Sequence, residues 1–334
     1  MSALLVVARR LRRPWPRFVA GGDARPPRDE DSAANCDPGV LSDIIAAVGP
    51  GLILLDADGV LWRGSAGIPQ APGFIRRAHR AGVRCVLISN NAGPSRAQYA
   101  TKCQGLGLEL GEADIFSVNY LAGPYLGQRH PGAEVLVVGS DELAASVRGH
   151  VSATGAEEWL SAHGGPSFAV GQCRPVEADD LAKLREVSCD IVLVGIDHNV
   201  NYLKLALACV AVQRGALLIG ANQDLTFPVE DGLELPGTGS TVRLIAGVTG
   251  AEPTYLGKPE PHLLELIARE TGVAYSEMLM LGDRVETDIV MAQRAGIPAF
   301  LVLTGVTSPQ EAPQGMDGVT VAATLDDVAR QLGF

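Results

Sequence analysis

The chain has 334 residues, of which 47% are hydrophobic, and its formal net charge is −11 at pH 7. The length favours two domains over a single core, and the acidic balance argues against a nucleic-acid partner, since phosphate backbones are bound by clustered Lys and Arg. No apolar stretch approaches the ~20 residues that a membrane-spanning helix needs, so we expect no membrane partner either.

The first 45 residues differ in composition from the rest of the chain. Five arginines between Arg9 and Arg17 precede any acidic residue, and an unpatterned stretch rich in Pro, Asp and Ala follows. We predict that residues 1–45 lie outside the fold, as a disordered tail or as a transit segment, since transit peptides are Arg-rich and acid-poor.

The cysteines point to a reducing compartment. They are widely scattered, with no C-x-x-C pair and no His at metal-ligand spacing: Cys36, Cys85, Cys103, Cys173, Cys189 and Cys209. We expect reduced packing residues and a cytoplasmic location. The alternative is a plastid or a mitochondrion, reached through the Arg-rich N-terminus.

Two carboxylates stand at the end of the first predicted strand. The apolar run from Leu52 to Leu55 predicts a strand buried on both faces, and Asp56, Asp58 and Gly59 follow it. Open α/β sheets bind their ligands at the carboxyl ends of strands, so the two acids can converge on one site.

The D-x-D-G pattern has several interpretations. An EF-hand calcium loop is excluded, because the chain continues Val60-Leu61-Trp62 and has Gly67 where the closing Glu should stand. A metal-binding D-x-D of nucleotide-sugar transferases and a plain polar turn after a strand both stay open.

Three further apolar runs end in polar residues. Arg84 to Ile88 precedes Ser89-Asn90-Asn91, Thr254 to Leu256 precedes Gly257-Lys258, and Met278 to Leu281 precedes Gly282-Asp283. Alternation of such runs with helical patterns is typical of a parallel sheet. We therefore expect all four strand ends to lie on one edge of that sheet and to share one site.

The segment between Asn91 and Lys258 is too long for a loop and predicts an inserted domain. Its expected strands are Glu134 to Val138, Phe168 to Val170, Ile191 to Val194 and Ala216 to Ile219. Its expected helices run from Ala178 to Val187 and from Asn201 to Gln213.

These residues suit the hydrolysis of a phosphate monoester. Asp56 would attack phosphorus and form an aspartyl-phosphate, while Asp58 would protonate the leaving oxygen and then activate water. Mg²⁺ would offset the repulsion between carboxylates and a phosphate dianion, with Asp283 as the second carboxylate.

The remaining polar residues also have simpler interpretations. Lys258 would neutralise phosphoryl oxygens or be an exposed lysine before Pro259, which is favoured in the first turn of a helix. Ser89, Asn90 and Asn91 would cup a phosphate oxygen or form a plain turn. For Asp288 we favour a mixed role, in which it caps the helix running to Gly296 and orients water bound to the metal.

The chain resembles the haloacid dehalogenase superfamily of phosphatases through four motifs in order: D-x-D-G-V-L-W, S-N-N, G-K-P and G-D-R-x-x-T-D. The long insertion resembles the type 2 cap of the NagD-like and 4-nitrophenylphosphatase subclass. This resemblance implies an α/β fold with a Rossmann-like parallel-sheet core, residues 46–131 and 252–334, and an inserted α/β type 2 cap domain, residues 132–251. It also implies a homodimer formed through the cap.

The same resemblance implies roles for individual residues. Asp56 is expected as the nucleophile and Asp58 as the general acid and base, with a phosphate pocket made by the residues Ser89, Asn90, Asn91 and Lys258. It implies that Mg²⁺ is held by the side chains of Asp56 and Asp283 and by the backbone carbonyl of Asp58.

Cap residues are expected to set the leaving group. Asn222 and Asp224 would limit its size, and Asn199 stands where pyridoxal phosphate phosphatase has a histidine that packs on the pyridine ring. Arg63 would meet a substrate carboxylate or be merely exposed, and Trp62 would line the closed cap or belong to the core.

The run DGVLWRG is most similar to the phosphoglycolate phosphatase branch. We therefore expect 2-phosphoglycolate, or glycerol 3-phosphate, as substrate. The alternatives are pyridoxal phosphate or a broad-specificity 4-nitrophenylphosphatase, a phosphoryl transferase of the mutase kind, and a phosphometabolite-binding module without turnover.

Overall fold

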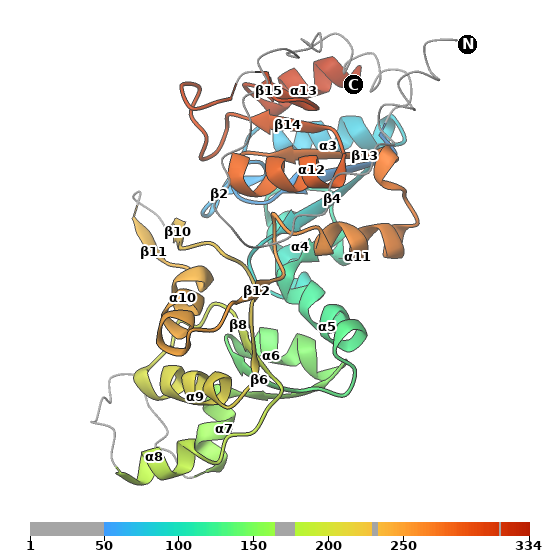
Figure 1. Ribbon diagram of the computed structural model, residues 1–334. Coiled ribbons are helices and arrows are strands. Elements are labelled where there is room, and N and C mark those ends of the chain that lie inside the picture. Colours follow the sequence, from blue (N-terminus) through green and yellow to red (C-terminus); the bar gives the residue numbers. More distant parts are fainter. Residues whose placement is uncertain (1–49, 164–177, 229–232, 314) are drawn as a thin grey trace, which may run out of the picture.

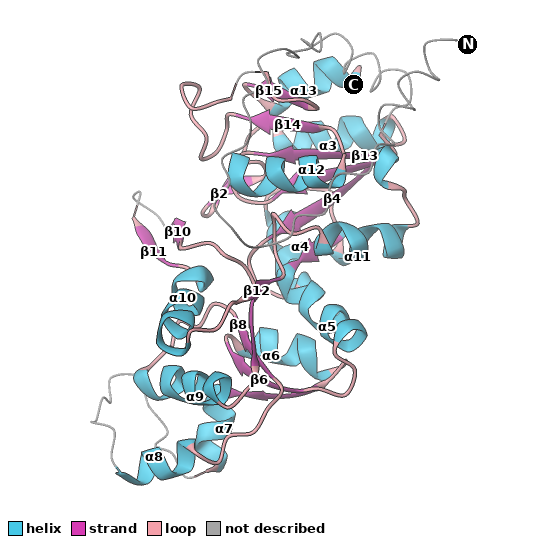
Figure 2. Ribbon diagram, in the orientation of Figure 1, coloured by secondary structure: helices cyan, strands magenta, loops and turns pink. Residues whose placement is uncertain are grey.

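The computed structural model describes residues 50–163, 178–228, 233–313 and 315–334. Within these ranges the chain forms two parallel sheets, each flanked by helices and placed one above the other (Figures 1 and 2). The expected α/β class is thereby confirmed. The upper unit in Figure 1 contains both ends of the described chain, and the lower unit is the predicted insertion.

The first sheet has six strands in the order β15-β14-β13-β1-β4-β5, and all its neighbours pair in parallel. These strands are β1 (Leu52–Asp56), β4 (Arg84–Ser89), β5 (Ile115–Ser117), β13 (Met278–Gly282), β14 (Ala299–Val302) and β15 (Val319–Ala322). Because β13, β1 and β4 are direct neighbours, the residues after their carboxyl ends lie side by side.

Helices cover both faces of this sheet. On β1, Ile53 and Leu55 pack with α3 (Ala71–Arg80), α4 (Arg96–Gly105) and α13 (Leu325–Leu332). Leu52 and Leu54 pack with α5 (Val118–Arg129), α11 (His262–Thr271) and α12 (Val290–Ala295) on the other face. Each fully buried side chain of this kind contributes about 1.5–3 kcal/mol, so β1 is held firmly from both sides.

Local sequence explains why the first-face helices form. In α3 the buried residues Ala71, Phe74, Ile75 and Ala78 recur at the spacing of one helical face. The N-cap of α4 is Ser95, whose hydroxyl accepts a hydrogen bond from the Gln98 amide while the Gln98 side chain accepts one from the Ser95 amide. This capping box fixes where α4 begins.

The second sheet has five strands in the order β12-β9-β8-β6-β7, all parallel. Its strands are β6 (Glu134–Val138), β7 (Ser152–Gly155), β8 (Ile191–Val194), β9 (Leu217–Gly220) and β12 (Thr254–Tyr255). One face packs against α7 (Ala156–Ala162), α8 (Ala178–Leu184), α9 (Tyr202–Gln213) and α10 (Thr238–Thr249), and the other packs against α5 and α6 (Asp141–Arg148).

The position of β12 corrects one prediction. We expected the run from Thr254 to Leu256 in the first sheet, but Thr254 pairs with Ile219 and Tyr255 with Gly220 at the edge of the second sheet. The insertion therefore continues past the predicted boundary at residue 251. A short apolar run predicts a strand but not its partner, because pairing depends on residues far away in the chain.

Helix α5 joins the two units. It follows β5 of the first sheet, leads into β6 of the second, and contacts both α11 and α6. Its buried residues belong to one apolar cluster that extends from the first sheet into the second.

The other predicted elements match closely where the structure describes them. The runs before Asn90 and Asp283 form β4 and β13, the expected strands of the insertion form β6, β8 and β9, and the expected helices form α8 and α9, with Asn201 as the N-cap of α9. The expected strand from Phe168 to Val170 and the predicted tail, residues 1–45, lie outside the described residues. Pro259 does not begin a helix, because α11 starts at His262.

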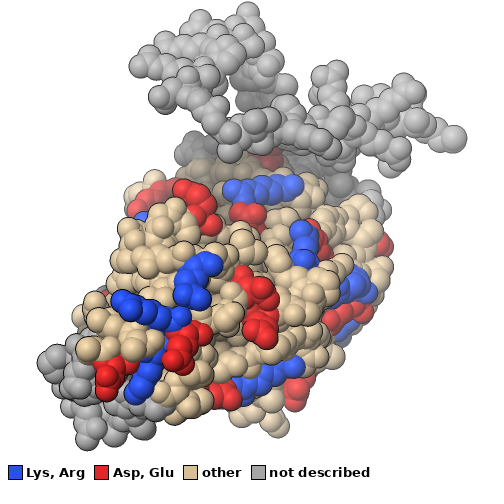
Figure 3. Space-filling view, turned by 60° about the horizontal axis from the view of Figure 1, so that its bottom comes forward, with Lys and Arg blue, Asp and Glu red and all other residues tan. Residues whose placement is uncertain are grey.

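The surface charges and the cysteines can be described for part of the chain. On the face seen in Figure 3, basic and acidic side chains are interspersed. The described cysteines Cys85, Cys103, Cys189 and Cys209 are free thiols. Within the described ranges, no helix combines the length and apolarity needed to cross a membrane.

Candidate active site

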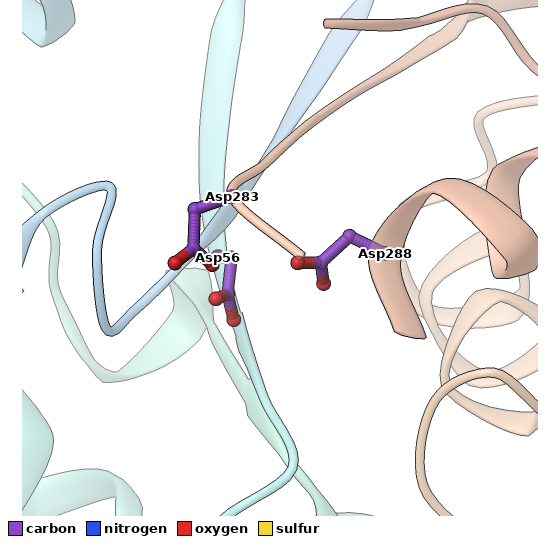
Figure 4. Close-up of side chains that lie close together, drawn as sticks. All are labelled: Asp56, Asp283 and Asp288. Atoms are coloured by element: carbon purple, nitrogen blue, oxygen red, sulfur yellow. The ribbon is translucent and has the colours of Figure 1, made fainter. Parts of the chain in front are cut away.

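Three carboxylates meet at the carboxyl edge of the first sheet. Asp56 ends β1, Asp283 follows β13, and Asp288 lies in a π-helical turn, Val285–Ile289, that leads into α12. One oxygen of each lies within 4.8 Å of the others. Figure 4 shows Asp56 and Asp283 close together, with Asp288 pointing toward them from the helical side.

Lys258 neutralises part of this cluster. Its Nζ donates to Asp56 Oδ1 at 2.5 Å and to Asp288 Oδ1 at 2.6 Å, and the residue is only 2% exposed. The second oxygen of Asp288 accepts a hydrogen bond from the Arg284 amide at 3.1 Å. Asp288 is therefore committed to holding the lysine and the helix start, whereas Asp56 faces the lysine with one oxygen.

Burial and neighbouring charges shift the pKa values of all four groups in this cluster. Burial raises the pKa of Asp56 to about 6, and the nearby charge of Lys258 opposes the rise. Burial also raises the pKa of Asp283 and of Asp288 to about 6, with further increases from Asp288 and Asp56 respectively. Although burial lowers the pKa of Lys258, the carboxylates of Asp288 and Asp56 raise it above its ordinary value.

This donor set fits a magnesium ion. Three carboxylates against one ammonium leave negative charge in excess at neutral pH, and burial penalises that charge. Mg²⁺ is a hard cation that favours one or two carboxylates together with phosphate oxygens and waters. A divalent cation beside Asp56 and Asp283 would relieve the excess charge.

Asp58 stands at the solvent-exposed side of the site. Removal of water by the surrounding protein raises the pKa of its carboxyl group, while the charge of Lys102 and a hydrogen bond from Trp62 oppose the rise. Lys102, on α4, lies 4.1 Å from the Trp62 ring centroid. Trp62 itself is 1% exposed, which places it in the core rather than on a cap-facing surface.

Ser89 ends β4 beside the carboxylates of β1. Its Oγ shares a 2.9 Å hydrogen bond with the Tyr99 hydroxyl and accepts a hydrogen bond from the Asn91 amide at 3.2 Å. Tyr99 stacks on Trp62 at a centroid distance of 6.1 Å. The Asn91 side chain caps the turn by accepting from the Gly93 amide at 2.9 Å.

Asn90 links the first sheet to the insertion. Its side chain accepts from the Lys258 amide at 2.7 Å and donates to the Lys258 carbonyl at 3.0 Å, so it binds both polar groups of that residue's backbone. It also donates to Asp224 Oδ2 at 3.2 Å, and its own carbonyl accepts from Asn222 at 2.7 Å. The two predicted cap residues Asn222 and Asp224 are thus brought to the site.

Asn199 is not joined to this network. It is exposed in the loop after β8, and its amide donates to Asp197 Oδ1 of the same loop at 2.8 Å. The Asp197 carboxylate also holds Lys204 of α9 at 3.0 Å. Asn199 therefore lies in a cap loop that the hydrogen bonds of the Asp197 carboxylate hold to α9.

Asp283 sits in a close backbone cradle. Its Oδ2 accepts a hydrogen bond from the Val306 amide at 2.6 Å. A Cβ built on Gly305 would lie 1.8 Å from that oxygen, and one built on Gly59, whose φ is +85°, would lie 2.3 Å from it. Only glycine permits this approach at both positions.

Two residues of the site were not anticipated. Tyr99 and Lys102 lie three residues apart on α4, the first helix after S-N-N, and this spacing on one helix face was the available signal. Arg63 is exposed, as one of its two interpretations predicted, and it also donates to the carbonyls of Thr304 and Gly305.

The fold and the site define a class: an α/β protein whose six-stranded parallel sheet carries a carboxylate–lysine centre at its edge, next to an inserted second sheet. Family comparison agrees. Residues 53–151 match the model of the haloacid dehalogenase-like hydrolases, and residues 255–330 match a second model described as HAD-hydrolase-like.

Curated relatives and solved structures are similar over most of the chain. A glycerol-3-phosphate phosphatase of Gallus gallus is 34% identical over 78% of this chain and 81% of its own length, and the 5'-nucleotidase YutF of Bacillus subtilis is 30% identical over 80% and 93%. The crystal structure of a thermostable NPPase double mutant from Geobacillus stearothermophilus is 30% identical, with a TM-score of 0.68 over 83% of this chain and 97% of that one.

The chain belongs to the haloacid dehalogenase-like hydrolases. It is an enzyme of that family's phosphatase group, with a parallel-sheet core and a cap, as the resemblance in its sequence implied.

Proposed function

We propose that this protein is a Mg²⁺-dependent phosphatase that hydrolyses small-molecule phosphate monoesters through an aspartyl-phosphate intermediate. The observation that carries the proposal is the position of Lys258 between Asp56 and Asp288, beside Asp283. A carboxylate with an adjacent ammonium and a second carboxylate nearby is suited to attack on a charged phosphoryl group.

Asp56 is the proposed nucleophile. Its free carboxylate oxygen forms a bond to phosphorus while the bond from phosphorus to the leaving oxygen breaks. Lys258 lies on the opposite oxygen, where its charge stabilises the phosphoryl oxygens as they approach. Asp288 keeps the lysine in place.

Asp58 is the proposed general acid and base. Burial raises the pKa of its carboxyl group, a shift that favours the protonated form needed to donate to the leaving oxygen. Once that proton has gone, the Asp58 carboxylate takes one from a water molecule, which attacks phosphorus, releases phosphate and restores Asp56.

The side chains of Asp56 and Asp283 and the backbone carbonyl of Asp58 would hold Mg²⁺. When bound, the ion supplies positive charge that offsets repulsion between Asp56 and the phosphoryl group. The proposed phosphate-binding residues are Ser89, Asn90, Asn91 and Lys258; the Asn91 amide donates to Ser89 Oγ. Asp288 would act by positioning Lys258.

As substrate we propose 2-phosphoglycolate or glycerol 3-phosphate, from which glycolate or glycerol would be the leaving group. A relative named a glycerol-3-phosphate phosphatase supports glycerol 3-phosphate. Another relative is named a 5'-nucleotidase, so nucleotides should be tested as substrates as well. Turnover of 2-phosphoglycolate, glycerol 3-phosphate, pyridoxal 5'-phosphate and nucleoside monophosphates with Mg²⁺ ranks them by kcat/KM. A highest value for pyridoxal 5'-phosphate would contradict the proposed substrate class.

Asp56→Asn tests the mechanism. The amide cannot act as a nucleophile, so release of 4-nitrophenol from 4-nitrophenyl phosphate should fall to the background rate while the far-UV circular dichroism stays unchanged. Asp141→Asn, at the exposed first turn of α6, makes the same chemical change away from the site and should retain wild-type turnover. Full activity of Asp56→Asn would rule out the proposed nucleophile.

A homodimer through the cap and a cytoplasmic location stay predictions. Light scattering after size-exclusion chromatography would report the first directly, with a monomer mass as the contrary result. Fractionation of the source cells would report the second.

A further inference from the structure

Arg63 binds a segment that lies more than two hundred residues away in the chain. It belongs to β2 (Trp62–Arg63), which forms a small antiparallel hairpin with β3 (Ala66–Gly67) just after Asp58. Its Nε donates to the Thr304 carbonyl at 2.7 Å and its Nη2 to the Gly305 carbonyl at 3.3 Å. A guanidinium is a rigid planar fork, so binding two successive carbonyls fixes the orientation of both peptide groups.

One of those peptide groups also contacts Asp283. The Gly305 carbonyl and the Val306 amide belong to the same planar trans peptide, in which C=O and N–H point in opposite directions. Arg63 binds the carbonyl end, and Asp283 Oδ2 accepts from the amide end at 2.6 Å. The orientation of the Asp283 carboxylate is therefore set through a single peptide plane whose other end is held by Arg63.

The same segment also holds the turn that carries Asp58. Thr304 Oγ1 donates to the Gly59 carbonyl at 2.6 Å, and the Gly59 amide donates to the Trp62 carbonyl at 2.7 Å. Because the Gly59 amide shares its peptide plane with the Asp58 carbonyl, that carbonyl points away from Trp62. The groups proposed to bind Mg²⁺ at Asp58 and Asp283 are thus tied to one short segment.

We propose that Arg63 is a positioning residue for the metal site: by gripping the carbonyls of Thr304 and Gly305 it aims the Asp283 carboxylate and steadies the turn of Asp58. This inference rests on the proposed function, because it assumes that these groups bind Mg²⁺. In this role Arg63 acts through the peptide groups of residues 304–306 and needs no contact with substrate.

The test measures Mg²⁺ binding without substrate. Isothermal titration of MgCl₂ into the full-length protein would compare the wild type with Arg63→Ala, Arg63→Lys and Thr304→Val. Loss of a group that orients a metal ligand typically weakens metal binding about 10–100-fold, so we expect the Kd for Mg²⁺ to rise at least about tenfold in Arg63→Ala. Arg63→Lys should show an intermediate rise, since an ammonium lacks the planar fork.

Arg76→Ala is the matched control, because Arg76 is an exposed arginine on α3 of the same unit. Its Kd for Mg²⁺ should equal the wild-type value. With 4-nitrophenyl phosphate, Arg63→Ala should need more Mg²⁺ for half-maximal rate, while its KM at saturating Mg²⁺ stays the same. Thermal unfolding in EDTA identifies any variant that has lost its fold, and Thr304→Val then provides the second, smaller perturbation of the same segment.

The outcomes separate the two proposals. If the wild type binds Mg²⁺ and Arg63→Ala binds it equally well, the role of Arg63 is refuted even if its melting temperature falls. If the wild type neither binds Mg²⁺ nor needs it for turnover, the proposed function fails first. A selective loss of Mg²⁺ affinity in Arg63→Ala and Thr304→Val, with Arg76→Ala unchanged, supports the inference.

Discussion

Replacing Lys258 by Met should destabilise the protein in a strongly pH-dependent way. Lys258 lies 2.5 Å from Asp56 and 2.6 Å from Asp288, and at an effective dielectric constant of ~20 each contact amounts to an attraction of about 6 kcal/mol before the cost of burial. Burial offsets much of this attraction. Removing one member of a buried ion pair typically costs about 3–5 kcal/mol, because the remaining charge is left without a partner.

The pH dependence follows from the raised pKa values of the two carboxylates. Both are raised to about 6 in the folded protein, above the ordinary value of 3.8, so the folded state binds more protons than the unfolded state between these values and stability falls as pH rises through this window. Lys258 lowers both pKa values, so Lys258→Met should raise them further and extend the window upward. The deficit of the variant should be largest above about pH 7 and should shrink toward pH ~5.

Urea unfolding in EDTA, followed by circular dichroism at about pH 5 and about pH 8, measures the deficit directly. Lys204→Met is the matched control, because Lys204 is another buried lysine, held by Asp197 at 3.0 Å and Glu157 at 3.3 Å in the cap. We expect the control to lose stability but keep turnover of 4-nitrophenyl phosphate, whereas Lys258→Met should lose both. A deficit that is equal at both pH values would refute the reasoning about the buried carboxylates.

Three further predictions concern neighbouring groups. Mg²⁺ should raise the melting temperature more at about pH 8 than at about pH 5, because protons compete for carboxylates whose pKa values are near 6; equal shifts in a thermal melt would contradict a carboxylate site. Asn90→Ala removes both side-chain hydrogen bonds to the Lys258 backbone, each of which contributes about 1 kcal/mol. It should therefore lower kcat more than the control Asn199→Ala, and an equal decrease in the two variants would contradict this role of Asn90. Tyr99→Phe removes the hydroxyl that meets Ser89 and should cost about 1 kcal/mol in urea unfolding, whereas no change would show that this hydroxyl contact does not stabilise the fold.

Much of the site was predictable because its residues follow buried strands. Asp56, Ser89 and Asp283 stand at the ends of β1, β4 and β13, which are neighbours in one sheet. Apolar runs that end in polar residues are a local signal, and parallel strands bring such ends together whatever their distance in the chain. The family resemblance then supplied expected roles that spacing alone left open.

The remaining features depend on contacts that no local pattern encodes. The apolar run before Lys258 predicted a strand, but its partner β9 could be identified only from the fold. Asn90 was expected to offer its backbone amide, whereas its side chain also binds the backbone of Lys258, 168 residues away. Arginine is a residue type usually found at the surface, so no sequence pattern indicates the bond partner of Arg63. Only the folded structure shows that Arg63 donates to the Gly305 carbonyl.

The hydrogen bonds of the second sheet do not end at β12. The amides of Leu256 and Gly257 continue the pairing, donating to the carbonyls of Gly220 at 3.0 Å and Ala221 at 2.9 Å, and the next residue is Lys258. The backbone ladder of the second sheet therefore extends to the residue that precedes Lys258. A displacement of β9 would be transmitted through two backbone hydrogen bonds to the two residues directly before Lys258, whose ammonium lies beside Asp56.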